Sequence, residues 1–309
     1  MRKFFKCEVT GYRTIDQWEE NCWVNVEIPN DEDFNFMIQN LRVPEDFLDD
    51  IADPDERSHT DSKGEWTLII IRIPFRQDND NQPYSTIPFG ILGNNENVVT
   101  VCYKQTEMIN DFILHTQRKN IFITNHFELI LRLLFSSTVW FQKYLKQINN
   151  KVNAAEKELE KSIRNEDLLQ LRNLQKTLVY FNTSIRGNEI MIGRLESLFQ
   201  SKGYHNKDLV EDVQIELKQA YNTANIYNDI LTGMMDAFAS IISNNVNTIM
   251  KRMTSISIVL MLPTLIASFY GMNVKVGFDK VPYAFAIIVC FSFTLAILAF
   301  IIFRKIKWF

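Results

Sequence analysis

The sequence lacks charge, proline and grouped cysteine in places where each absence is informative. Residues 253–270 and 283–303 contain no Asp, Glu, Lys, Arg or His. No proline occurs from residue 89 to residue 262, although six of the eight prolines lie before residue 89. The four cysteines show no spacing typical of a metal site, so we interpret them as small buried hydrophobic residues in a reducing cytosol or in a membrane.

Other absences argue against whole classes of protein. A net charge of -4 argues against a nucleic-acid binder. An enzyme finds no support either, because there is no Gly-rich phosphate loop, nucleophile elbow or metal-hydrolase helix. Residues 1–20 lack an apolar signal core and acquire acids early, so we expect neither a secretory signal nor a transit peptide.

The two uncharged segments predict two membrane-spanning helices. An α-helix needs about 20 apolar residues to cross the hydrocarbon core, and the segments contain 18 and 21 residues. Basic residues flank the pair, whereas the connecting loop is nearly neutral, and basic flanks mark the cytoplasmic side. We therefore expect a multi-pass protein of the cell (plasma or inner) membrane with both termini in the cytoplasm. The flanking residues are Lys251, Arg252, Arg304, Lys305 and Lys307.

The remaining chain divides by composition into a mixed α/β head and a helical body. Strands are predicted at residues 23–28, 66–73, 86–92 and 98–103, and short helices at 30–40 and 44–51. The pattern becomes helical after residue 121, with a break near residue 165. We expect an α+β cytoplasmic domain (1–125), a helical part (126–204), a long stalk helix (205–252), a pore-lining transmembrane helix (253–271), an external loop (272–282), a second transmembrane helix (283–303) and a basic cytoplasmic tail (304–309).

One continuous helix is predicted from about Lys207 into the membrane, about 90 Å long over about 60 residues. Its first half carries an apolar seam with alternating steps of four and three, which demands partner helices. Its second half continues this spacing with mostly polar side chains. The seam is Val213, Leu217, Ala220, Ala224, Tyr227, Leu231, Met234, Phe238 and Ile241. The polar stripe is Asn247, Met250, Thr254, Ser257, Met261, Thr264 and Ser268.

Two interpretations of the polar stripe compete. Ser and Thr help membrane helices to pack and can bond to their own backbone. We favour a pore lining, because the stripe keeps its register for six turns and polar groups in a membrane usually face protein or water. Two helices cannot enclose a pore, so several copies must form a ring. Met250 and Met261 would narrow such a pore, although gap-filling in a packed core explains them equally well.

The loop Tyr270-Gly271-Met272-Asn273 follows the stripe directly. It places neutral oxygen-bearing groups where the helix leaves the membrane. Mg²⁺ gives up its waters reluctantly, and the neutral dipoles of Gly271 and Asn273 suit a hydrated ion. A dication gains roughly 4 to 5 kcal/mol on entering a cell held at 100 mV, negative inside, so influx needs no coupled ion.

The Tyr-Gly-Met-Asn motif, closing the first of two C-terminal spans, resembles that of the CorA-type Mg²⁺ transporters. The resemblance covers the whole chain and includes residues 23–29, 53–57 and 68–74 of the head, 231–236 and 243–247 of the stalk, 261–273 of the pore helix and 304–309 of the tail. It implies a funnel-shaped homopentamer that passes Mg²⁺ and is regulated by it. Among its expected pore-facing residues are Asn247, Met250, Met261 and Thr264.

The resemblance also implies metal sites. Asn273 is the expected external site for hydrated Mg²⁺. A regulatory Mg²⁺ is expected between neighbouring cytoplasmic domains, where it holds the closed state through Asp212, with Asp208 and Glu211 close by. Asp78 is preferred to Asp80 as the partner from the head. One departure is that Asp279, the only acid of the external loop, stands where family members often place a Glu.

Two rivals stay open at this point. A Zn²⁺ transporter of the same architecture is one, although the four histidines are scattered and make no softer-metal site, so Mg²⁺ leads, with Co²⁺ or Ni²⁺ as further cargo. A non-conducting, membrane-tethered coiled-coil sensor is the other. The polar stripe argues against it, because a mere anchor gains nothing from hydroxyl groups in register.

Overall fold

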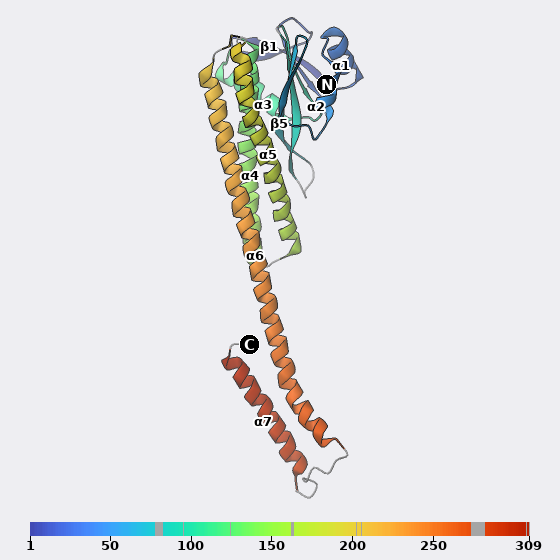
Figure 1. The fold of residues 1–309 in the computed structure, drawn as a ribbon, viewed down its shortest axis with the longest axis vertical. Coiled ribbons are helices and arrows are strands. Elements are labelled where there is room, and N and C mark those ends of the chain that lie inside the picture. The colour runs from blue at the N-terminus through green and yellow to red at the C-terminus, as the bar shows by residue number, and fades with distance from the viewer. Residues whose placement is uncertain are drawn as a thin grey trace. The chain divides into compact units, whose positions relative to one another are not determined.

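The computed structural model describes residues 1–77, 83–94, 96–123, 125–161, 164–201, 203–204, 206–272, 282–306 and 308. It forms two units, Met1–Thr232 and Gly233–Phe309, with the elements labelled in Figure 1. The first unit contains a sheet with helices, and the second contains the end of one long helix and all of another. This confirms the expected fold class of an α/β domain, a long helix and two apolar helices near the C-terminus.

A seven-stranded sheet organises the first unit, in the order β2-β1-β3-β7-β6-β5-β4. β3 and β7 are parallel, and the other described pairs are antiparallel. The predictions for β3, β5, β6 and β7 are confirmed, but the sequence patterns did not predict β1 or the two edge strands β2 and β4. The strands are β1 Arg2–Glu8, β2 Gly11–Ile15, β3 Trp23–Glu27, β4 His59–Lys63, β5 Trp66–Arg76, β6 Tyr84–Gly93 and β7 Val98–Cys102.

Short helices pack on one face of this sheet. They are α1 (Asp31–Asn35), the π-helical turn η1 (Phe36–Asn40) and α2 (Glu45–Ala52). Asn30 begins α1 with a capping box, because its side chain accepts from the Asp33 N–H and Asp33 bonds back, which confirms the predicted start. Met37 and Phe47 are buried in one hydrophobic core with strand residues such as Val24.

Longer helices meet the sheet on its other side (Figure 1). They are α3 (Glu107–Lys119), α4 (His126–Lys161) and α5 (Asn165–Ser201). The break between α4 and α5 lies where it was predicted. The prediction that the pattern becomes helical after residue 121 places this change too late, because α3 already begins after its N-cap Thr106. Trp23 of β3 contacts Phe112 of α3 edge to face, with ring centroids 5.8 Å apart.

The long helix α6 runs without interruption from Lys207 to Tyr270, as predicted. In the first unit its seam is buried, with Val213, Leu217 and Leu231 all at 0 % exposure. Hydrogen bonds tie it to two partner helices: Gln142 of α4 donates to Glu216 at 2.6 Å, and Gln175 of α5 donates to Thr232 at 2.9 Å. The prediction that this seam requires partner helices is therefore confirmed here.

The second unit contains the rest of α6 and the helix α7 (Ala284–Lys305). Both helices are long and apolar enough to cross a membrane. Their apolar windows are almost entirely unburied within the chain, unlike the core helices of a soluble protein. The last seam residue, Ile241, is 46 % exposed within the chain. The expectation that the cysteines are small buried hydrophobic residues is wrong for Cys290, which is exposed on α7.

Candidate pore-lining face and cation sites

The polar stripe and the contact with α7 lie on different sides of α6. All seven stripe residues are exposed within the chain. A second row, Ser255, Val259, Leu262 and Ile266, is buried or half-buried. At 3.6 residues per turn, the two rows are about 140° apart around the helix. The second row therefore meets α7, and the stripe is left free on the far side.

An apolar cavity of about 380 Å³ shows how the two helices meet. It is lined by residues from the end of α6 and the beginning of α7. Since the chain reverses direction between these ends, the helices run antiparallel within the second unit. The lining residues are Ile266, Phe269, Tyr270, Ile287, Ile288 and Phe291.

Two hydroxyl groups of the stripe are oriented by their own helix. The Ser257 hydroxyl donates to the Met253 carbonyl at 2.9 Å, and the Thr264 hydroxyl donates to the Leu260 carbonyl at 3.0 Å. These bonds are the back-bonds expected of a packing role, yet both residues are exposed. A hydroxyl group that donates its hydrogen to a backbone carbonyl can act only as a hydrogen-bond acceptor toward its surroundings. The waters around a cation point hydrogens outward, so this face can accept hydrogen bonds from a hydrated cation.

The signature loop is described as far as Met272. The Gly271 N–H continues the helix by donating to the Ala267 carbonyl at 2.9 Å. A Cβ built on Gly271 would meet the oxygens of Ala267 and Ser268 at 3.4 and 3.6 Å, which is ordinary contact, and φ is outside the left-handed region. Nothing in the described chain therefore requires glycine here. Asn273 itself lies outside the described residues.

The predicted regulatory carboxylates lie at the start of α6. Asp208, Glu211 and Asp212 are all exposed, and Asp208 and Asp212 share a helix face because they are four residues apart. Carboxylate oxygens are ligands that Mg²⁺ accepts, so these side chains fit part of its shell. The predicted partner Asp78 and its alternative Asp80 lie outside the described residues.

The structure adds neighbours to Asp212 that the sequence did not reveal. Asp212 lines a cavity of about 220 Å³ together with Asp111 and His115 of α3 and Arg132 of α4. The only available signal was the four-residue spacing of Asp111 and His115, which places them on one helix face. Among the described residues, no three His, Cys, Asp or Glu side chains come together so as to hold a metal ion.

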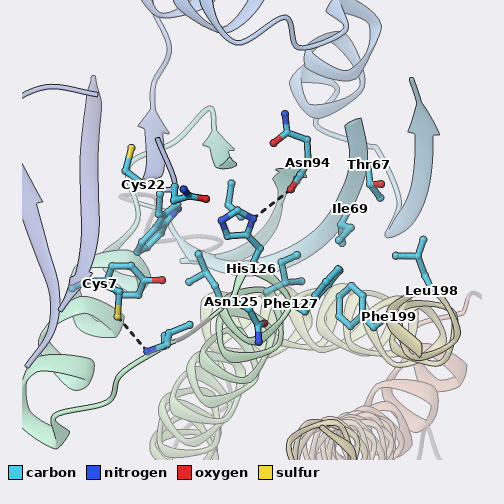
Figure 2. Close-up of a pocket in the computed structure, with 18 residues that line it drawn as sticks. Cys7, Cys22, Thr67, Ile69, Asn94, Asn125, His126, Phe127, Leu198 and Phe199 are labelled. Atoms are coloured by element: carbon cyan, nitrogen blue, oxygen red, sulfur yellow. Dashed lines mark hydrogen bonds between the residues drawn. The ribbon is translucent and has the colours of Figure 1, made fainter. Parts of the chain in front are cut away.

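A larger cavity of about 380 Å³ in the first unit differs in chemistry (Figure 2). No Asp, Glu, Lys or Arg occurs among its described lining residues. His126 bonds through Nδ1 to the Asn94 carbonyl at 3.4 Å, and burial lowers the pKa of its imidazole. The rings of Phe127 and Phe199 lie beside it, tilted by 57° with centroids 4.7 Å apart. This cavity has no carboxylate among its described lining residues and is unsuited to a hard cation such as Mg²⁺.

Comparison with known proteins places these features in one family. The family model described as CorA-like Mg²⁺ transporter protein matches residues 18–305. The cobalt/magnesium transport protein CorA of Methanocaldococcus jannaschii is 21% identical over 291 residues, which cover 93% of this chain and 90% of that protein. The magnesium transport protein CorA of Helicobacter pylori is 26% identical over 255 residues, covering 78% and 76%.

Solved structures show the same fold. The complete structure of the CorA magnesium transporter from M. jannaschii aligns with a TM-score of 0.84 at 20% identity, covering 100% of this chain and 99% of that one. The full-length CmaX protein aligns with a TM-score of 0.72 at 16% identity, covering 99% and 97%. The family match extends over nearly the whole chain and includes both apolar helices and the signature loop. This protein therefore belongs to the CorA-like Mg²⁺ transporter family, a family of divalent-cation transporters.

Proposed function

We propose that this chain is one subunit of a homopentameric channel through which hydrated Mg²⁺ enters the cell, driven by the membrane potential. The observation that carries the proposal is the exposed polar stripe of α6, opposite the face that meets α7. A ring of such helices places Thr254, Ser257, Met261, Thr264 and Ser268 around a water column, with α7 outside. Asn247 and Met250 line the cytoplasmic end of this water column.

Selection at the pore mouth is assigned to the loop Tyr270-Gly271-Met272-Asn273. The absence of any steric need for glycine within the described chain supports a need imposed by the ring or by the ion. A hydrated ion approaches a backbone carbonyl closely only where no Cβ intervenes. The Asn273 carboxamide then accepts hydrogen bonds from the water shell of Mg²⁺, which stays intact. Co²⁺ and Ni²⁺ are further cargo.

Regulation by cytosolic Mg²⁺ is assigned to Asp212, with Asp208 and Glu211 beside it and Asp78 from the head as partner. Exposed carboxylates at the start of α6 repel one another and the same groups on neighbouring copies. Mg²⁺ relieves that repulsion in the closed arrangement only, so it shifts the equilibrium by its differential affinity. Both termini lie in the cytoplasm and α6 and α7 cross the cell membrane.

The test is flux through purified protein in liposomes. Mg²⁺ uptake should follow an imposed negative potential, should not need a proton gradient, and should disappear in Asn273→Ala with assembly intact. Zn²⁺ flux that exceeds Mg²⁺ flux would establish the zinc alternative, and no flux of either ion would leave only the non-conducting sensor.

A further inference from the structure

Four exposed cations gather where the two apolar helices leave the membrane on one side. Lys251 and Arg252 lie on α6, and Arg304 and Lys305 form the last turn of α7. All four are exposed, and none forms an ion pair with a described residue. We call these four residues the basic collar.

Geometry places the two halves of the collar at one level. Ile266 of α6 and Ile288 of α7 line the same cavity. Arg252 lies 14 residues before Ile266, about 21 Å along α6, and Arg304 lies 16 residues after Ile288, about 24 Å along α7. Since the helices are antiparallel, these two arginines reach the same height to within about one helical turn.

Within the second unit, the sequence offers the collar almost no opposite charge. No Asp or Glu occurs in residues 237–278 or in residues 281–309. The nearest acid before the collar is Asp236, 15 residues from Lys251, or about 22 Å along α6. Within this unit the positive charge of the collar is uncompensated, so it attracts anions from its surroundings.

The neighbouring aromatic residues identify the surroundings as a lipid interface. The Trp308 ring stacks on Phe303 with ring centroids 5.5 Å apart and 13° between planes, and the Trp308 N–H donates to the Phe303 carbonyl. This contact holds an indole at the end of α7, and tryptophan concentrates at the level of lipid headgroups. The collar is therefore at headgroup depth, where the phosphates of phospholipids are the available anions.

We propose that the basic collar binds the phosphate groups of anionic phospholipids and so clamps the end of α7 to α6. Arg252 and Arg304 grip phosphate oxygens through paired N–H donors, and Lys251 and Lys305 add point charges. The side chains of α6 that face α7 are small or medium in size, with Ser255 at 0 % exposure. They offer a limited apolar contact area, so bound lipid would add to the attachment of α7. The proposal shares with the proposed function only the premise that both helices cross the membrane.

The experiment measures lipid retention by the full-length chain. Wild type, Arg252→Gln/Arg304→Gln and the control Lys275→Gln/Lys280→Gln are reconstituted in nanodiscs of phosphatidylcholine with or without phosphatidylglycerol. Lipids that stay bound are counted by native mass spectrometry. At about 1 kcal/mol per cation, loss of two arginines should weaken phosphatidylglycerol binding about 30-fold, and the control, which removes the same charge from the connecting loop, should bind as wild type does.

Three results would overturn the proposal. One is equal retention of phosphatidylglycerol by wild type and the arginine variant, and another is equal retention of phosphatidylglycerol and phosphatidylcholine. The third is displacement of the lipid by excess inorganic phosphate, which would identify a free-anion site. Mg²⁺ flux is measured on the same protein preparations. Loss of flux with normal lipid binding would contradict only the proposed function, and normal flux without lipid binding would contradict only the basic collar proposal.

Discussion

Two serines on α6, two residues apart, provide a matched test of the pore assignment. Ser257 belongs to the exposed stripe, whereas Ser255 is fully buried on the side that meets α7. Each hydroxyl donates to the carbonyl four residues earlier, at 2.9 Å for Ser257 and 2.7 Å for Ser255. The two side chains therefore differ in the face they occupy and hardly in chemistry.

Ser257→Ala should reduce Mg²⁺ flux strongly. The variant loses an outward-facing acceptor in every copy, and a hydrogen bond contributes about 0.5 to 1.5 kcal/mol. At the low end, the five copies of the proposed ring together lose about 2.5 kcal/mol of stabilisation for the hydrated ion, which corresponds to about 70-fold in rate. Flux is measured in liposomes at a fixed potential, with protein content matched.

Ser255→Ala is the control. It removes a buried hydroxyl that is satisfied within its own helix, so it should cost about 1 kcal/mol of stability or less and leave flux near that of wild type. Equal flux from both variants would refute the assignment of the two faces. A larger loss in Ser255→Ala would mean that the pore lies on the other side of α6.

Further predictions concern the first unit. Asn188→Ala should lower the free energy of unfolding by about 2 to 4 kcal/mol. The buried Asn188 side chain accepts a hydrogen bond from the Arg72 backbone N–H at 3.0 Å and donates one to the Arg72 carbonyl at 2.8 Å. A change below about 1 kcal/mol in chemical denaturation would contradict this reasoning. Asp212→Ala should raise open probability at millimolar cytosolic Mg²⁺, with Asp229→Ala, exposed on the same helix, as the unaffected control in patch recordings. Because burial lowers the pKa of His126 below the ordinary value of 6.5, the unfolded chain binds the proton more readily, so stability near the start of α4 should fall as pH drops below 6.5. Hydrogen exchange should detect this fall in wild type and not in His126→Gln.

Much of the fold was predictable because the strongest patterns are local. β5 is an almost continuous apolar run, and the α6 seam repeats over many turns, so either could be predicted without tertiary information. The missed strands β1 and β4 read RKFFKCE and HTDSK. β4 is an edge strand, and sequence patterns assign its polar composition to loops. β1 is paired on both sides, but four of its seven residues are charged, which weakens its strand signal. The helix α3 carries sequence signals that predict a helix, namely Thr106 at its start and basic residues in its last turn.

For the candidate sites, the sequence predicts which residues share one face of a single helix, but not which residues from different helices lie together. The stripe from Asn247 to Ser268 depends on the helical period alone, so its common face followed from spacing. The neighbours of Asp212 could not be predicted from spacing, because Asp111 of α3 and Arg132 of α4 line the same cavity. Which residues meet there depends on how three helices pack, and no local pattern encodes that.

The most direct measurement is the environment of single cysteines placed along α6. With exposed Cys290 replaced by serine, Ser257→Cys and Thr264→Cys are introduced into the full chain in liposomes, and Leu260→Cys serves as a reference off the stripe. At low Mg²⁺, a charged, membrane-impermeant thiol reagent should modify Cys at 257 and 264, block flux and spare position 260. Modification of 257 and 264 only by a lipid-soluble reagent, with flux unchanged, would place the stripe against lipid and contradict the pore.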